Sequence, residues 1–175
     1  LPHQISGGVA SLKADEDRLA FSAIFILDKN AQVLSKTFTK SVINSKKRFT
    51  YEEAQEVLDK QAGPYLLELN QLFALAKVMR TRRQAEGAID FGDNEVKFEL
   101  DEKTGVPLRV VRKVRIDTNW LIEEFMLLAN REVAKHVFKL AEKVPEKRFA
   151  FLYRIHDEPK QDRIAELQTF VRAIG

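Results

Sequence analysis

The sequence of 175 residues contains no cysteine, so a disulfide framework and a thiolate metal site are both excluded. This absence suits a reducing compartment, and we expect a cytoplasmic protein. No apolar run approaches the ~18 to 20 residues that a membrane span needs, and no basic and then apolar signal segment opens the chain. The sequence therefore predicts neither a membrane partner nor a disulfide-stapled secreted domain.

Several catalytic motifs are also missing. The sequence has no GxxxxGK[ST] phosphate loop, no GxGxxG and no GxSxG nucleophile elbow. The three histidines, His3, His136 and His156, do not have metal-ligand spacing, and no tight cluster of aspartates offers a two-metal site. The residue chemistry by itself thus indicates no catalytic centre within these residues.

The overall composition is that of a globular domain. Hydrophobic residues make up 45% and charged residues 31%, and the length is enough for one domain with a sizeable core. The chain begins with LPHQISGG, a loop-like stretch without an initiating methionine. We expect a segment of a longer protein, and no pattern in it predicts an oligomeric state.

Basic residues are gathered in three stretches although the net charge is only +3. They are Lys77, Arg80, Arg82 and Arg83; Arg109, Arg112, Lys113 and Arg115; and Lys135, His136, Lys139, Lys143, Lys147 and Arg148. Such stretches suit a polyanion such as nucleic acid. The alternative is that they are solvated faces balanced by the 26 acidic residues, and charge alone favours this alternative.

Two strands joined by a tight turn are predicted near the start of the chain. Residues 17–28 (DRLAFSAIFILD) carry an apolar side chain at every second position. The residues that share this face are Leu19, Phe21, Ala23, Phe25 and Leu27. Asn30 in the turn suits a positive φ, and residues 32–40 are expected to return antiparallel.

Further strands are predicted at residues 95–100 and 107–114, on either side of the turn DEKTG, and at residues 149–155, which we expect to be buried. Together with the intervening helices they predict an α+β fold, a mostly antiparallel sheet with packed helices. No linker suggests a second domain.

Thr50 followed by Glu53 fits a capping box, which predicts a helix from Tyr51 to about Lys60. A second helix is predicted over 65–83, where leucines recur at three- and four-residue steps.

A third helix, capped by Asp117 or Thr118, is expected to run to about Leu140. Pro159 opens a last one with a single apolar face.

The third helix contains the stretch LIEEFMLLAN, in which two neighbouring glutamates are predicted to differ. Each helical residue advances ~100°, so Glu123 shares a narrow polar stripe with Asn119 and Asn130. Glu124 points ~100° away and is expected to be a solvated, ion-pairing residue that faces Arg131 and Lys135. The stripe makes Glu123 the better candidate of the two glutamates for a side chain that faces a polar cavity. The alternative for Glu123 is a first-turn glutamate that the helix dipole stabilises.

An ordered series of motifs resembles one family. The stretches are LP, ISGGVASL, DRLAFS, SVINSKKRFTY, RTRRQAEGAIDF, LIEEFMLLANREVAKHV and LYRIHDEP. In this order they are similar to the RNB catalytic domain of the ribonuclease II and ribonuclease R exoribonucleases, and LIEEFMLLAN and LYRIHDEP favour the ribonuclease R branch. One departure is Ala10, where many relatives carry a cysteine.

The resemblance implies a processive exoribonuclease that degrades single-stranded RNA from the 3′ end and releases nucleoside 5′-monophosphates. It implies Mg²⁺ held by aspartates upstream of this chain, and an arginine-rich segment downstream. We therefore expect residues 1–175 to be a partial RNB domain without catalytic or metal-binding residues of its own.

The same resemblance implies a site for the RNA 3′ end. Phe91 matches an aromatic residue that stacks on the terminal bases, Tyr51 a tyrosine near the terminal ribose, and Glu123 a glutamate that contacts the ribose hydroxyls. Arg80, Arg82 and Arg83 are possible contacts to the RNA backbone. The alternative for Phe91 and Tyr51 is an ordinary packing role.

Three functions remain open at this point. The first is part of a magnesium-dependent 3′-to-5′ exoribonuclease. The second is a catalytically inactive RNB-like module that binds RNA 3′ ends. The third is a purely structural protein whose basic stretches are unrelated to RNA.

Overall fold

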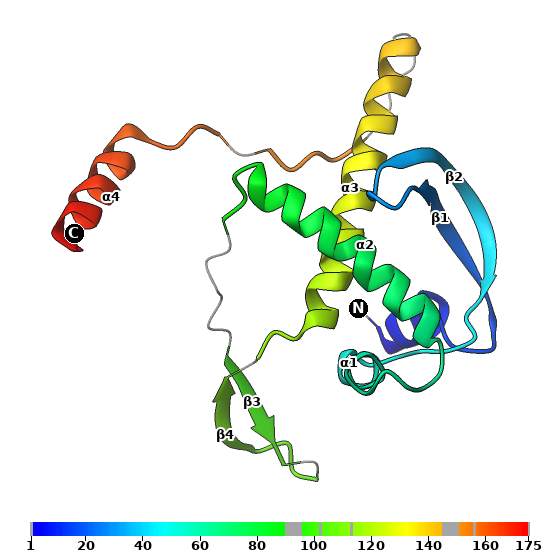
Figure 1. The fold of residues 1–175 in the computed structure, drawn as a ribbon. Helices are drawn as coiled ribbons and strands as arrows, with labels where there is room; N and C mark the ends of the chain where they lie inside the picture. The colour runs from blue at the N-terminus through cyan, green and yellow to red at the C-terminus, as the bar shows by residue number, and fades with distance from the viewer. Residues whose placement is uncertain are drawn as a thin grey trace. The chain divides into compact units, whose positions relative to one another are not determined.

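The structure, a computed structural model, describes residues 2–89, 96–101, 103–112, 114–144, 151–155 and 157–174. A short π-helical segment, η1 (Gln4–Val9), comes first. The strands are β1 (Asp17–Leu27), β2 (Val33–Asn44), β3 (Val96–Leu100) and β4 (Pro107–Arg112), and the helices are α1 (Tyr51–Lys60), α2 (Leu66–Ala85), α3 (Asp117–Lys143) and α4 (Gln161–Ile174) (Figure 1). The chain thus contains both strands and helices, as the predicted α+β class requires.

The strands form two small antiparallel sheets, β1 with β2 and β3 with β4. The chain divides into two compact units, Leu1–Val133 and Ala134–Gly175, so that α3 begins in the first unit and ends in the second. None of the described helices is long and apolar enough to cross a bilayer.

The turn between β1 and β2 is organised by one carboxylate. Asp28 Oδ1 accepts hydrogen bonds from the backbone N–H groups of Asn30, at 2.9 Å, and Gln32, at 2.8 Å. The residue with positive φ is Ala31, at 53°, so the prediction for Asn30 is wrong. Ala31 is 2% exposed, because its side chain lies in the core.

That core lies where the β1–β2 turn meets α2 and α3. Ala31, Met79 and Leu128 are buried together, and the half-buried side chains packed around them are Phe25, Leu27, Val33, Leu75 and Phe125. The predicted apolar face of β1 therefore reaches the core only at its end. Leu19, at the start of the same strand, is 86% exposed.

The expectation of a buried strand at 149–155 is wrong for its described part. Residues 151–155 form no strand, and Leu152 is 97% exposed. A strand needs a partner for its backbone hydrogen bonds, and the described residues of the second unit are helical apart from this segment and its immediate neighbours. α4 forms as predicted, but none of its residues is buried.

Candidate nucleic-acid interface

Tyr51 is held at the first position of α1 by the predicted capping box. The Glu53 backbone N–H donates to Thr50 Oγ1 at 3.1 Å, and the Thr50 N–H donates to Glu53 Oε2 at 2.8 Å. The hydrogen bond from the Thr50 backbone lowers the pKa of Glu53 below its usual value. The start of α1, and with it Tyr51, is fixed by local chemistry that the sequence predicts.

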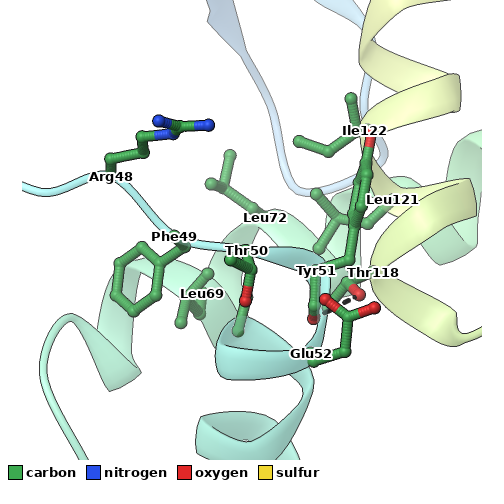
Figure 2. A pocket seen from close by; sticks show the side chains of 11 residues that line it. Arg48, Phe49, Thr50, Tyr51, Glu52, Leu69, Leu72, Thr118, Leu121 and Ile122 are labelled. Carbon is green, nitrogen blue, oxygen red and sulfur yellow. Dashed lines mark hydrogen bonds between the residues drawn. The ribbon is translucent and has the colours of Figure 1, made fainter. Parts of the chain in front are cut away.

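Tyr51 borders a cavity of about 500 Å³ between the start of α1, α2 and α3. Figure 2 shows the Tyr51 ring next to Leu121 and Ile122 of α3. The complete lining is Arg48, Phe49, Thr50, Tyr51, Glu52, Ala54, Leu69, Leu72, Thr118, Leu121 and Ile122. The cavity is therefore lined mainly by apolar residues, and Arg48 and Glu52 are its two charged lining residues.

The start of α3 is attached directly to this wall by Thr118. Its buried side-chain Oγ1 donates to the Tyr51 carbonyl at 2.9 Å, and its backbone N–H donates to Gln55 Oε1 at 3.1 Å. Asp117 and Thr118, the two predicted caps, both lie inside the first turn of α3. Asn119 accepts instead from the Ile116 N–H at 3.0 Å. These bonds fix Tyr51 and the first turn of α3 relative to each other.

The two neighbouring glutamates of α3 form a network with two arginines. Glu124 is 3% exposed and accepts from Arg83 Nη2 at 2.6 Å and from Arg83 Nε at 3.1 Å. Glu123, with 36% of its side chain exposed, lies 3.4 Å from Arg83 Nη2 and also pairs with Arg115 Nη2. Glu124 is ion-paired as predicted, but its partner is Arg83 of α2, and the residue is buried and not solvated.

This difference has a physical reason. Periodicity along one helix gives angles between its side chains, but it does not say which neighbouring helix lies on each side. α2 approaches the side that carries Glu124, so a carboxylate there requires a charged partner, which Arg83 supplies. Arg131 and Lys135 were the expected partners.

The predicted polar stripe does not line the cavity. Asn119 uses its carbonyl oxygen for the Ile116 N–H, Asn130 is exposed, and the α3 residues at the cavity are Thr118, Leu121 and Ile122. Glu123 directly follows Ile122, a residue of the cavity lining, but it does not line the cavity itself. Its carboxylate pairs with Arg83 and Arg115.

The three arginines predicted to contact the RNA backbone all have partners within the chain. The Arg80 guanidinium lies over the Trp120 ring at 5.2 Å, and Arg82 Nη2 donates to the Asn30 carbonyl. Arg83 pairs with the two glutamates. A guanidinium has five N–H donors, so the role at the RNA backbone stays a prediction.

Phe91 lies outside the described residues. Among the residues that the structure describes, no group of three or more histidine, aspartate or glutamate side chains has the arrangement that holds a metal ion. The resemblance assigns the Mg²⁺ ligands to aspartates upstream of this chain, and that assignment stays a prediction.

Comparison with known proteins decides the family. The RNB domain model matches residues 1–174. The chain belongs to the RNB family. This confirms the resemblance found in the motif series.

The relatives of this RNB chain are named as exonucleases and ribonucleases. It is 37% identical to the probable exosome complex exonuclease RRP44 of Caenorhabditis elegans over all of its length and 18% of that protein. It is 35% identical to ribonuclease R of Thermotoga maritima, again over its whole length and 24% of that protein. The chain thus spans about a fifth of the length of these relatives.

The fold of the RNB chain matches solved structures as well. Mycoplasma genitalium RNase R in complex with ribose methylated single-stranded RNA superimposes with a TM-score of 0.81, at 24% identity, over 99% of this chain and 26% of that one. The same enzyme in complex with double-stranded RNA gives 0.83 at 23% identity, over 100% and 30%. This likeness confirms the predicted α+β fold of an RNB domain.

Two functional-site features were missed from the sequence. Thr118 was predicted only as a helix cap, and the partnership of Arg83 with Glu123 and Glu124 was not predicted. The signal that could have shown the partnership was a surplus of charge: two adjacent glutamates in an apolar helix require cations, and Arg83 lies in the last turn of the preceding helix.

Proposed function

We propose that this chain is part of a magnesium-dependent, processive 3′-to-5′ exoribonuclease that releases nucleoside 5′-monophosphates from single-stranded RNA. The observation that carries the proposal is the RNB match over residues 1–174, supported by relatives named as exonucleases and ribonucleases. The Mg²⁺ ligands are proposed to lie outside these residues, and the full-length protein is proposed to be cytoplasmic.

Within that enzyme, the chain is proposed to hold the last nucleotides at the RNA 3′ end. Glu123 accepts hydrogen bonds from the terminal ribose hydroxyls, for which an ionised carboxylate is a good acceptor. A 2′-hydroxyl distinguishes RNA from DNA, so this contact selects RNA. Tyr51 lies beside the ribose. Phe91 stacks on a base, a contact worth roughly 1 to 3 kcal/mol whatever the base.

The geometry of the described residues supports this role in two ways. The Thr118 hydrogen bond keeps Tyr51 and the start of α3 together, and Glu123 follows five residues later, ~7.5 Å along the helix axis. Glu123 also remains partly exposed while its neighbour Glu124 is buried, so only the first of the two is available to a ligand.

A 3′-exonuclease assay on the full-length protein tests the proposal. The expected result is stepwise shortening of a 5′-labelled single-stranded RNA, with Glu123→Ala or Phe91→Ala changing the turnover or the length of the final product. Arg163→Ala, which removes an exposed ion pair of α4, is the control and should leave both unchanged. If Glu123→Ala and Phe91→Ala digest RNA as the wild type does, the site assignment is wrong.

The same assay separates the alternative function. Tight binding of the RNA with no shortening in the presence of Mg²⁺ would favour the inactive RNA-binding module. The isolated 175 residues are expected to release no nucleotides, because the proposed metal ligands are elsewhere. Magnesium-dependent RNA decay by a clean preparation of the isolated chain would contradict that expectation.

A further inference from the structure

Arg83 links two carboxylates that differ in how they are held. It lies in the last turn of α2, and its guanidinium faces adjacent residues of α3. Two of its nitrogens donate to the same oxygen of Glu124, Nη2 at 2.6 Å and Nε at 3.1 Å. The same Nη2 reaches Glu123 Oε1 at the longer distance of 3.4 Å.

Burial identifies which of these contacts fixes the arginine. Glu124 is 3% exposed, and a buried carboxylate is stable only with a charged and hydrogen-bonded partner. Arg83, with 29% of its side chain exposed, is therefore anchored by Glu124. Glu123 is the most exposed of these three side chains, so it keeps surface for a contact from outside the chain.

The two oxygens of Glu123 are held from different directions. Oε1 faces Arg83 at the end of α2, and Oε2 pairs with Arg115, in the segment that precedes α3. Two cations on opposite oxygens restrict rotation of the carboxylate. A carboxylate has about four lone-pair sites, so capacity remains to accept from a ligand hydroxyl.

We infer that Arg83 is a positioning residue that orients the Glu123 carboxylate toward the 3′-terminal ribose, with the buried Glu124 as the anchor of Arg83. This inference rests on the proposed function. Arg83 sets the ribose preference through Glu123 and not through a contact of its own with the terminal ribose. A lysine cannot replace it, because an ammonium is a point charge without the planar fork that serves both glutamates together.

The test measures ribose preference by binding. Two RNA oligonucleotides that differ only in a ribose or a 2′-deoxyribose at the 3′-terminal nucleotide are bound to the full-length protein with a metal chelator present, so that no cleavage occurs. The wild type is expected to prefer the ribose end. Arg83→Lys should reduce this preference roughly tenfold, which equals the loss of one hydrogen bond to a charged group. Arg163→Lys should not change it.

A double variant separates positioning from direct contact. Once Glu123→Gln has lowered the preference, adding Arg83→Lys should lower it no further, because the arginine acts only through that carboxylate. If Arg83→Lys fails to fold, Glu124→Gln serves in its place, since it weakens the anchor and should reduce the preference in the same way.

The outcomes are distinct. In one outcome, Glu123→Gln abolishes the ribose preference and Arg83→Lys leaves it at the wild-type value. This result overturns the inference about Arg83 but not the proposed role of Glu123. An additional loss in the double variant also overturns it, because Arg83 would then contact the RNA independently. A wild type with no ribose preference, unchanged by Glu123→Gln, overturns the proposed role of Glu123 and the inference with it.

Discussion

The two compact units of the chain bury the side chains of their helices to different extents. In the first unit, α2 and α3 bury Met79 and Leu128 and even the charged Glu124. In the second unit, α4 carries apolar residues on one face, but every one of its residues remains at least partly accessible. Helical periodicity therefore predicts the helix in both units, while burial depends on whether another element lies against that face.

The contrast between the units predicts that substitutions of charged residues differ most in their effect on the free energy of unfolding. Glu124→Ala leaves Arg83 near a buried position without its main partner, and should lower the free energy of unfolding by about 3 kcal/mol. Glu166→Ala in α4 removes an exposed ion pair with Arg163 and should change it by less than about 0.5 kcal/mol. Urea unfolding followed by circular dichroism measures both. Equal losses would contradict the contrast between the units.

Substitutions of apolar residues should also cost more stability in the first unit than in the second, by a smaller difference. Leu128→Ala opens a cavity in the core beside Ala31 and Met79, and should cost about 2 to 3 kcal/mol. Leu167→Ala removes a side chain that is already exposed, so stability should hardly change. A loss of similar size at Leu167 in thermal unfolding would show that α4 is covered in solution.

Removal of a threonine hydroxyl should also affect stability differently in the two units, by a still smaller amount. Thr50→Ala removes the cap that holds Tyr51 at the start of α1 and should cost about 1 kcal/mol. Thr169→Ala in α4 removes only a hydroxyl that donates to the Ala165 carbonyl within the helix, and should be neutral or slightly stabilising. Chemical unfolding of the two variants side by side tests this difference, and a larger loss for Thr169→Ala would refute it.

The smallest predicted effect is a pH dependence of the same cap. The folded-state pKa of Glu53 lies below its unfolded value, chiefly because of the hydrogen bond from the Thr50 backbone. Its contribution is therefore present above the usual glutamate pKa of ~4.3 and is lost as the pH falls through the lowered folded-state pKa. Glu53→Gln should be less stable than the wild type at pH 7 and equal to it in strong acid. A difference that persists unchanged into acid would contradict this.

Local signals in the sequence predicted much of the fold. The capping box at Thr50, the start of α1 at Tyr51 and the β1–β2 hairpin all depend on residues close together in the chain, and they appear as expected. The predicted strand within residues 149–155 has no such support. Its apolar character indicated burial, but a strand also needs a partner edge, which is a property of the tertiary structure.

The candidate site was predictable only in part for the same reason. The motif series indicated Tyr51 and Glu123 as candidate contacts of the RNA 3′ end. The capping box explains why Tyr51 is fixed at the start of α1. The roles of Glu124 and Arg83 depend on how α2 packs against α3. Arg83 is 40 residues from Glu123 and 41 from Glu124 along the chain, so a local sequence pattern could not predict their contact. Angles along one helix separate two glutamates correctly and still assign the wrong environment to one of them.

The proposed binding of the RNA 3′ end can be measured with two RNAs that differ only in a ribose or a 2′-deoxyribose at the 3′-terminal nucleotide. The measured quantity is the ratio of the affinities of the full-length protein for the two. We expect the wild type to prefer the ribose end by roughly tenfold or more, and Glu123→Ala to lose most of this preference. A Glu123→Ala protein that is folded and keeps the full wild-type preference would contradict the claim that this chain holds the RNA 3′ end through Glu123.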